Sequence, residues 1–107
     1  MMDIAVGLAL EGKKPFVYSI TPFLIYRPYE TIRTYINHEK IPVRMIGSGR
    51  DKDYKHDGIS HWSQDVRKIL YPLTNIRQDY PINKEEIPKL VTSYVKDDVP
   101  TFLSLRR

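Results

Sequence analysis

One short segment of this chain gathers several side chains that could do chemistry. Residues 54–65 read YKHDGISHWSQD and hold Asp57, His61 and Asp65 at intervals of four. On a continuous helix this spacing would put all three on one face, where carboxylate and imidazole groups can hold a metal ion. However, Ser60 is a good N-cap and predicts a helix that begins only near His61. This start removes the shared face, so we predict no metal site.

The other candidate groups also have structural explanations. His61 at the start of a helix could simply be exposed to solvent, and His56 fits a solvated loop. Gly47 and Gly49 follow a predicted strand and could let a phosphate approach, but a tight turn explains them equally well. Phe23 fits a ligand pocket and a core equally well. The sequence alone leaves these alternatives open.

The elements that must position these residues alternate between helix and strand. The patterns predict a helix from Ile4 to Gly12, a strand at Phe16–Ile20, a helix within Phe23–His38 that becomes regular near Arg27, a strand at Val43–Gly49, a helix from His61 to about Leu70, a short strand within Asn75–Tyr80, a helix from Asn83 to about Val95 and a strand at Thr101–Leu105. Such alternation predicts an α/β fold with a mostly parallel sheet flanked by helices. Ligands in such sheets bind beyond the carboxyl ends of the strands.

Composition narrows the class of protein. The 107 residues fit one domain, and 41% hydrophobic with 28% charged residues is ordinary globular composition. The net charge is +4, and the basic residues are scattered along the chain rather than clustered, which disfavours a nucleic-acid binder. Without cysteine, disulfides and thiolate zinc sites are excluded. The chain contains no apolar run near 18 residues, so no membrane span is predicted. An acidic residue near the start disfavours a signal peptide, and we therefore expect a cytoplasmic protein.

Several motifs follow one another along nearly the whole chain, from about Ile4 to Leu105. They are the alanine- and glycine-rich IAVGLALEGKKP, the strand and turn FVYSITPFL, the segment IPVRMIGSG and the loop DGISHWSQD. Their order and spacing resemble the central, pyrimidine-binding domain of transketolases and of their relatives, 1-deoxyxylulose-5-phosphate synthase and the β-subunits of 2-oxo-acid dehydrogenases. The resemblance implies a thiamine diphosphate-binding fold, with residues 1–107 as one pyrimidine-binding domain.

The resemblance implies a shared cofactor site. Such proteins bind thiamine diphosphate between two domains, usually from two subunits: one grips the diphosphate and Mg²⁺, and the other holds the aminopyrimidine ring in an apolar pocket. The pocket positions that match here are Val17, Ile20 and Phe23. Strand residues such as Val17 would also be expected in any core.

The loop DGISH matches the family's substrate loop. The resemblance implies that Asp57, Gly58 and Ser60 belong to this loop, with His61 as the catalytic histidine near the reactive end of the cofactor. The substrate would be a sugar phosphate or a keto acid.

Two departures from the family pattern limit the expected activity. The segment that carries the family's catalytic glutamate would precede Met1, and Glu11 lies too far along the helix to replace it. The diphosphate and Mg²⁺ motif is also absent, and Ile20 stands where relatives often have an aromatic ring. We therefore expect a domain truncated at its N-terminus, lacking its first strand and the glutamate.

These points predict one part of a split or truncated transketolase. Alone it would be inactive; with a diphosphate-binding partner domain it would act as a transferase, as a homodimer or hetero-oligomer. The alternative is a non-catalytic dimerisation or regulatory module of the same fold. The exposed strand edge left by a missing first strand also favours pairing with another chain.

Overall fold

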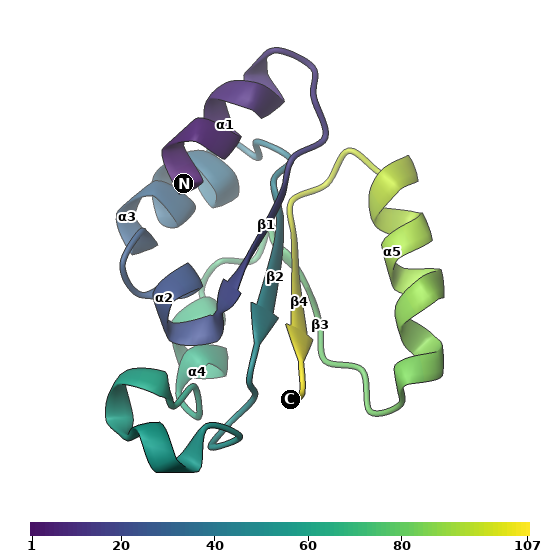
Figure 1. Cartoon of the computed structure of the whole chain (residues 1–107). Helices are drawn as coiled ribbons and strands as arrows, with labels where there is room; N and C mark the ends of the chain where they lie inside the picture. The colour runs from purple at the N-terminus through teal and green to yellow at the C-terminus, as the bar shows by residue number, and fades with distance from the viewer.

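A parallel four-stranded sheet forms the centre of the molecule (Figure 1). The computed structural model describes all residues, 1–107. The strands are β1 (Phe16–Ile20), β2 (Arg44–Ser48), β3 (Arg77–Asp79) and β4 (Thr101–Leu105). They lie in the order β1-β2-β4-β3, and every neighbouring pair is parallel. The predicted parallel α/β fold is confirmed, and all four predicted strands are present.

Helices cover the two faces of this sheet unequally (Figure 1). One face carries α1 (Met2–Leu10), α2 (Thr21–Ile25), α3 (Tyr29–Thr31), the π-helix η1 (Ile32–His38) and α4 (Val66–Leu70). The other face carries α5 (Ile87–Lys96), which follows the short 3₁₀ turn η4 (Lys84–Glu86). Two further 3₁₀ turns, η2 (Lys55–Asp57) and η3 (Ile59–His61), lie in the loop after β2. None of the helices is long and apolar enough to cross a membrane.

The core lies between the sheet and the helices on its more heavily covered face. Val17, Met45 and Phe102 lie side by side on neighbouring strands, in register and buried. Ile32 and Ile36 of η1 are fully buried against the same cluster. Burying each side chain of this size contributes about 1.5–3 kcal/mol, so this layer fixes the sheet and therefore the positions of its carboxyl ends.

The opposite face buries a charged side chain, Arg44, at the amino end of β2. Its guanidinium donates to the carbonyls of Tyr94 (3.0 Å), Pro42 (2.5 Å) and Asp97. Tyr94 and Asp97 lie at the last turn of α5, where the helix dipole favours a positive charge. Arg44 therefore joins the end of α5 to the sheet.

The structure corrects the predicted helix that starts at His61. The helix α4 begins only at Val66, and Trp62 has an extended backbone with ψ 143°. The hydroxyl of Ser63 donates to the carbonyl of Gly49, and its N–H donates to the carbonyl of Asp51. These bonds hold residues 62–65 against the end of β2 and prevent them from continuing a helical turn.

The predicted helix within Phe23–His38 is divided into pieces. It begins earlier than expected, at Thr21, and Pro28 separates α2 from α3. Pro28 fits the edge of a helix better than its interior because it lacks an N–H and its ring clashes with the preceding turn. Further along the chain, the predicted cap at Asn83 is confirmed by a capping box with Glu86.

Candidate functional site

The candidate site lies at the carboxyl ends of β1 and β2. Ile20 is the last residue of β1, and α2 starts immediately after it, so Phe23 falls in the first turn of α2. The segment 49–65, which we name the β2 loop, projects beyond the ends of the strands in Figure 1. The fold therefore brings two segments that are far apart in the sequence to one edge of the sheet.

Phe23 and His61 meet directly at this edge. The two rings pack edge to face, with centroids 5.0 Å apart. The Arg27 guanidinium lies 4.3 Å from the centroid of the Phe23 ring, and the Tyr54 ring lies 6.2 Å from that of His61. The hydroxyl of Ser60 lies 2.9 Å from Nδ1 of His61. These contacts place an imidazole beside an aromatic ring that is itself only half-buried.

The three residues expected to contact a pyrimidine ring lie in different environments. Ile20 and Phe23 are half-buried at the carboxyl end of the sheet. Val17 lies near the amino end of β1, 4% exposed within the core. Of the three, Phe23 contacts His61, Ile20 is half-buried at the end of β1, and Val17 belongs to the core.

The expected substrate-loop residues form a turn that projects from the domain. Asp57 ends η2 and is exposed, and Gly58 adopts a φ of +78°, which favours glycine. Ser60 is exposed in the next turn, η3. No three histidine or acidic side chains come together in a metal-binding group, so Asp57 and Asp65 do not join His61 in a ligand set.

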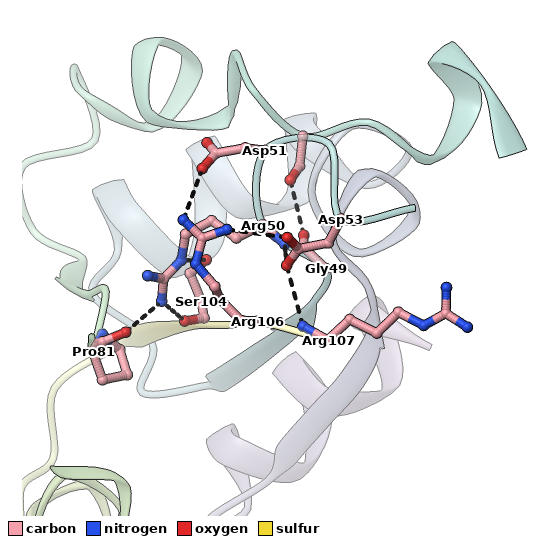
Figure 2. Close-up of polar contacts among 9 residues, drawn as sticks. Gly49, Arg50, Asp51, Asp53, Pro81, Ser104, Arg106 and Arg107 are labelled. Carbon is pink, nitrogen blue, oxygen red and sulfur yellow. Dashed lines mark hydrogen bonds and ion pairs between the residues drawn. The ribbon is translucent and has the colours of Figure 1, made fainter. Parts of the chain in front are cut away.

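A buried arginine anchors the start of the β2 loop (Figure 2). Arg50 is 7% exposed, and its Nε donates to the Ser104 hydroxyl at 3.2 Å. Its Nη2 donates to the carbonyls of Pro81 (2.9 Å) and Ser104. Burial lowers the pKa of Arg50, and the charges of Arg106 and Arg67 lower it further. Arg50 thus ties the loop to the carboxyl end of β4.

Asp53 completes this anchor from within the loop (Figure 2). Its carboxylate accepts from the backbone N–H groups of Arg50 (2.9 Å) and Arg107 (3.1 Å), and from Nη1 of Arg106 (3.0 Å). Partial burial alone would raise the pKa of Asp53, but these donors and the Arg106 charge outweigh it and lower the pKa. The Asp53 carboxylate therefore joins the start of the β2 loop to the C-terminal residues Arg106 and Arg107.

Two tyrosines bind the far end of the loop region to the helical layer. The Tyr26 hydroxyl donates to the Asp65 carboxylate, and the Tyr29 hydroxyl donates to the carbonyl of Ile69 at 2.9 Å. Burial raises the pKa of Tyr26, and the hydrogen bond and charge of Asp65 raise it further. Tyr26 thus stays protonated and remains a donor at all ordinary pH values.

Sequence reasoning missed Arg50, Asp53 and the role of Tyr26. Arg50 follows a strand whose carboxyl end was expected to carry a site, and this position could have singled it out. Tyr26 lies three residues after Phe23, and Asp65 lies four after His61. On a helix such intervals would bring side chains to one face, but residues 61–65 precede α4, and only the fold shows that the two segments face each other.

The chain also matches a protein-family model along its whole length. The model describes the pyrimidine-binding domain of transketolase, and it matches residues 1–107. The chain belongs to this family. The resemblance derived from the motifs is therefore confirmed for this pyrimidine-binding domain.

Curated relatives of this pyrimidine-binding domain are longer proteins. It is 24% identical over 107 residues to a 6-deoxy-6-sulfo-D-fructose transketolase subunit of Clostridium sp. (strain MSTE9), matching 100% of this chain and 33% of that protein. It is 25% identical over 105 residues to an uncharacterized 33.6 kDa protein in the fasciation locus of Rhodococcoides fascians, matching 98% of this chain and 34% of that protein. The chain thus spans about a third of the length of these relatives.

Solved structures share the fold of the pyrimidine-binding domain. A split-gene transketolase, described as an inactive beta4 tetramer, superposes with a TM-score of 0.85 and 24% identity, over 99% of this chain and 33% of that chain. A transketolase from Campylobacter jejuni superposes with a TM-score of 0.85 and 19% identity, over 99% of this chain and 17% of that chain. At these identities the likeness establishes the fold.

Proposed function

We propose that this domain supplies the pyrimidine-binding half of a thiamine diphosphate site in a transketolase-type enzyme assembled from more than one chain. The observation that carries the proposal is the pair of Phe23 and His61, 5.0 Å apart at the carboxyl edge of the sheet in a chain of this family. The name of the Clostridium relative, a transketolase subunit, supports an assembly of several chains.

The residues at this edge suit one part of the cofactor. Ile20 and Phe23 offer a half-buried apolar and aromatic surface of the kind that holds a planar ring. Arg27 is exposed and lies over Phe23, so a ring stacking on that face would displace its guanidinium. When bound, thiamine diphosphate supplies the carbanion chemistry, and the protein orients it.

His61 is the proposed catalytic residue of this half-site. It lies beside Phe23, and its imidazole is a group that can accept a proton and give it back. Asp57, Gly58 and Ser60 in the projecting turn are proposed to contact the substrate, a sugar phosphate or a keto acid. These roles require that substrate reaches the β2 loop from outside the domain.

A partner domain is proposed to provide the remaining groups. Glu11 is the C-cap of α1, in the connection that leads to the amino end of β1, whereas the candidate site lies at the carboxyl ends of the strands. The proton-relay carboxylate is therefore proposed to come from another segment or chain, and the diphosphate and Mg²⁺ from a diphosphate-binding domain. On this proposal the 107 residues alone have no transferase activity.

Isothermal titration tests the proposal directly. Thiamine diphosphate with Mg²⁺ would be titrated into the chain alone and into its mixture with a diphosphate-binding chain from the same organism. We expect binding in the mixture and about tenfold or greater weakening by Phe23→Ala, because an aromatic contact contributes on the order of 1–3 kcal/mol. Tyr71→Ala, at a tyrosine that is 83% exposed, is the matched control. Absence of binding with and without the partner would refute the cofactor role.

A non-catalytic dimerisation module is the second candidate function. The observation that favours it is α1, which is apolar on both sides: it buries Met2 and Val6 but exposes Ile4 (69%) and Leu8 (45%). A helix with apolar residues all round is usually buried. Self-association together with no binding of thiamine diphosphate in any mixture would favour this function.

A further inference from the structure

Three contacts in series join the helix-bearing segment 23–29 to the segment 61–69. Phe23 packs on His61, Tyr26 donates to Asp65, and Tyr29 donates to the carbonyl of Ile69. The first partners are spaced by three residues and the second by four. We name this series the aromatic ladder.

The middle contact of the aromatic ladder is the strongest tie near His61. The Tyr26 hydroxyl donates to a carboxylate side chain, and hydrogen bonds to carboxylates are roughly twice as strong as those between neutral groups. The His61 side chain has ring contacts with Phe23 and Tyr54 and a bond to the adjacent Ser60, and the His61 backbone N–H donates to Gly58 within the same turn. Nothing in its own contacts would hold it firmly against α2.

The backbone around His61 gives little independent support. The turn η3 is a single 3₁₀ turn, Trp62 is extended, and α4 starts only at Val66. Ser63 ties this part of the chain to Gly49 and Asp51 at the end of β2, but not to α2. The polar bond that joins residues 61–65 to α2 and its C-cap is the hydrogen bond from the Tyr26 hydroxyl to Asp65.

We propose that Tyr26 and Asp65 are positioning residues of the half-site, and that their hydrogen bond fixes the His61 imidazole against the Phe23 ring. The placement of His61 by this bond is argued from the contacts above. The importance of that placement for catalysis rests on the proposed function. Losing the bond would let His61 move relative to a ring held by Phe23. A displacement of about 1 Å in a catalytic group can cost on the order of a hundredfold in rate.

The imidazole proton signals of His61 in the NMR spectrum report this geometry without any ligand. A Phe23 ring 5.0 Å away shifts them from their values in a free histidine. In Tyr26→Phe we expect most of this shift to be lost while the far-UV circular dichroism stays unchanged. Tyr29→Phe, which removes a tyrosine hydroxyl bond to a backbone carbonyl one step further from His61, should keep the shift.

Substitution of the acceptor adds a rescue test. Asp65→Asn retains a carbonyl oxygen that can accept from Tyr26, so we expect it to keep most of the His61 shift. Asp65→Ala removes the acceptor and should match Tyr26→Phe. If Tyr26→Phe leaves the His61 signals as unchanged as Tyr29→Phe does, the positioning role is wrong.

The assembled complex separates this inference from the proposed function. With the diphosphate-binding partner, Tyr26→Phe should lower kcat about tenfold or more while the affinity for thiamine diphosphate changes less than twofold. An unchanged kcat would overturn the catalytic meaning of the positioning. If the mixture binds no thiamine diphosphate but Tyr26→Phe still displaces the His61 signals, the proposed function fails and the geometric inference holds.

Discussion

Two buried arginines mark the two ends of β2. Arg44 lies at its amino end and Arg50 just beyond its carboxyl end, and both donate to backbone carbonyls. Burying a guanidinium costs several kcal/mol unless its donors find acceptors. Each arginine therefore holds in place the segments whose carbonyls surround it, α5 in one case and the loop before η4 in the other.

Replacing Arg44 tests the first of these anchors. In Arg44→Met the carbonyls of Tyr94, Pro42 and Asp97 lose their donor, so we expect the free energy of unfolding to fall by about 2–4 kcal/mol. Urea denaturation followed by circular dichroism measures this. Lys68→Met, at an exposed lysine, is the control and should change stability by less than about 0.5 kcal/mol. Equal effects of the two changes would contradict the anchoring role.

Asp53 gives the loop base a pH dependence. Its folded-state pKa is lowered, so its ionised form stabilises the fold above about pH 4, and this stabilisation is lost as the pH falls through the folded-state pKa. We expect Asp53→Asn to lower the urea midpoint at pH 7. Below pH 4, the midpoint of this variant should fall less steeply with decreasing pH than that of the wild type. Glu11→Gln, at an exposed carboxylate that makes no side-chain hydrogen bond or ion pair, should leave the wild-type midpoint at pH 7 nearly unchanged. If the urea midpoint of Asp53→Asn fell with pH as steeply as that of the wild type, the stabilising role of the Asp53 carboxylate would be wrong.

At the scale of elements, the turn from β2 into its loop is tightly packed. Gly49 has a φ of +82°, and a Cβ there would lie 2.2 Å from the Tyr54 ring. The hydroxyls of Tyr54 and Ser48 lie 2.9 Å apart across the same turn. The Tyr54 ring in turn lies beside His61, so the turn and the candidate site are packed together.

Gly49→Ala tests this packing. The added methyl group must displace Tyr54 and adopt a strained φ, so we expect a loss of about 1–3 kcal/mol in unfolding free energy, measured by urea denaturation. Gly7→Ala is the matched control. Gly7 lies within α1 with nothing within 4 Å of its added Cβ, so alanine should raise stability by about 0.5–1 kcal/mol. A neutral Gly49→Ala would show that Tyr54 does not hold the turn.

At the scale of the whole molecule, several large apolar side chains remain exposed on β1 and α1. The edge strand β1 exposes Phe16 (41%) and Tyr18 (62%), and α1 exposes Ile4 and Leu8. The helix α5 covers the sheet face beside β3 and β4 (Figure 1). An edge strand and a helix that expose apolar side chains are features of protein–protein contacts.

Sedimentation velocity tests whether this surface associates. We expect the chain to sediment as a dimer or larger species at micromolar concentration, alone or with its proposed partner. Ile4→Lys with Leu8→Lys should shift it toward the monomer because the charges would be buried in the contact. Ile82→Lys, at a loop residue that is 88% exposed, is the control. Strictly monomeric wild-type protein in both conditions would contradict this use of α1.

Local patterns determined the elements of this protein. The strand Phe16–Ile20, the strand Thr101–Leu105 and the capping box of Asn83 all follow from alternation, β-rich composition and cap residues that lie close together in sequence. The order of the motifs also determined the family, since the model for the pyrimidine-binding domain matches the whole chain. The candidate loop and its histidine were named for the same reason.

The tertiary structure decided how these elements meet. It moved the start of the helix from His61 to Val66, because Ser63 bonds to the end of β2 rather than to a helical neighbour. It also paired Tyr26 with Asp65, 39 residues away. Long-range contacts of this kind depend on how the sheet aligns distant segments, which no local pattern of residue types encodes. The sequence therefore singled out candidate residues such as Phe23 and His61, and the fold determined which of them touch.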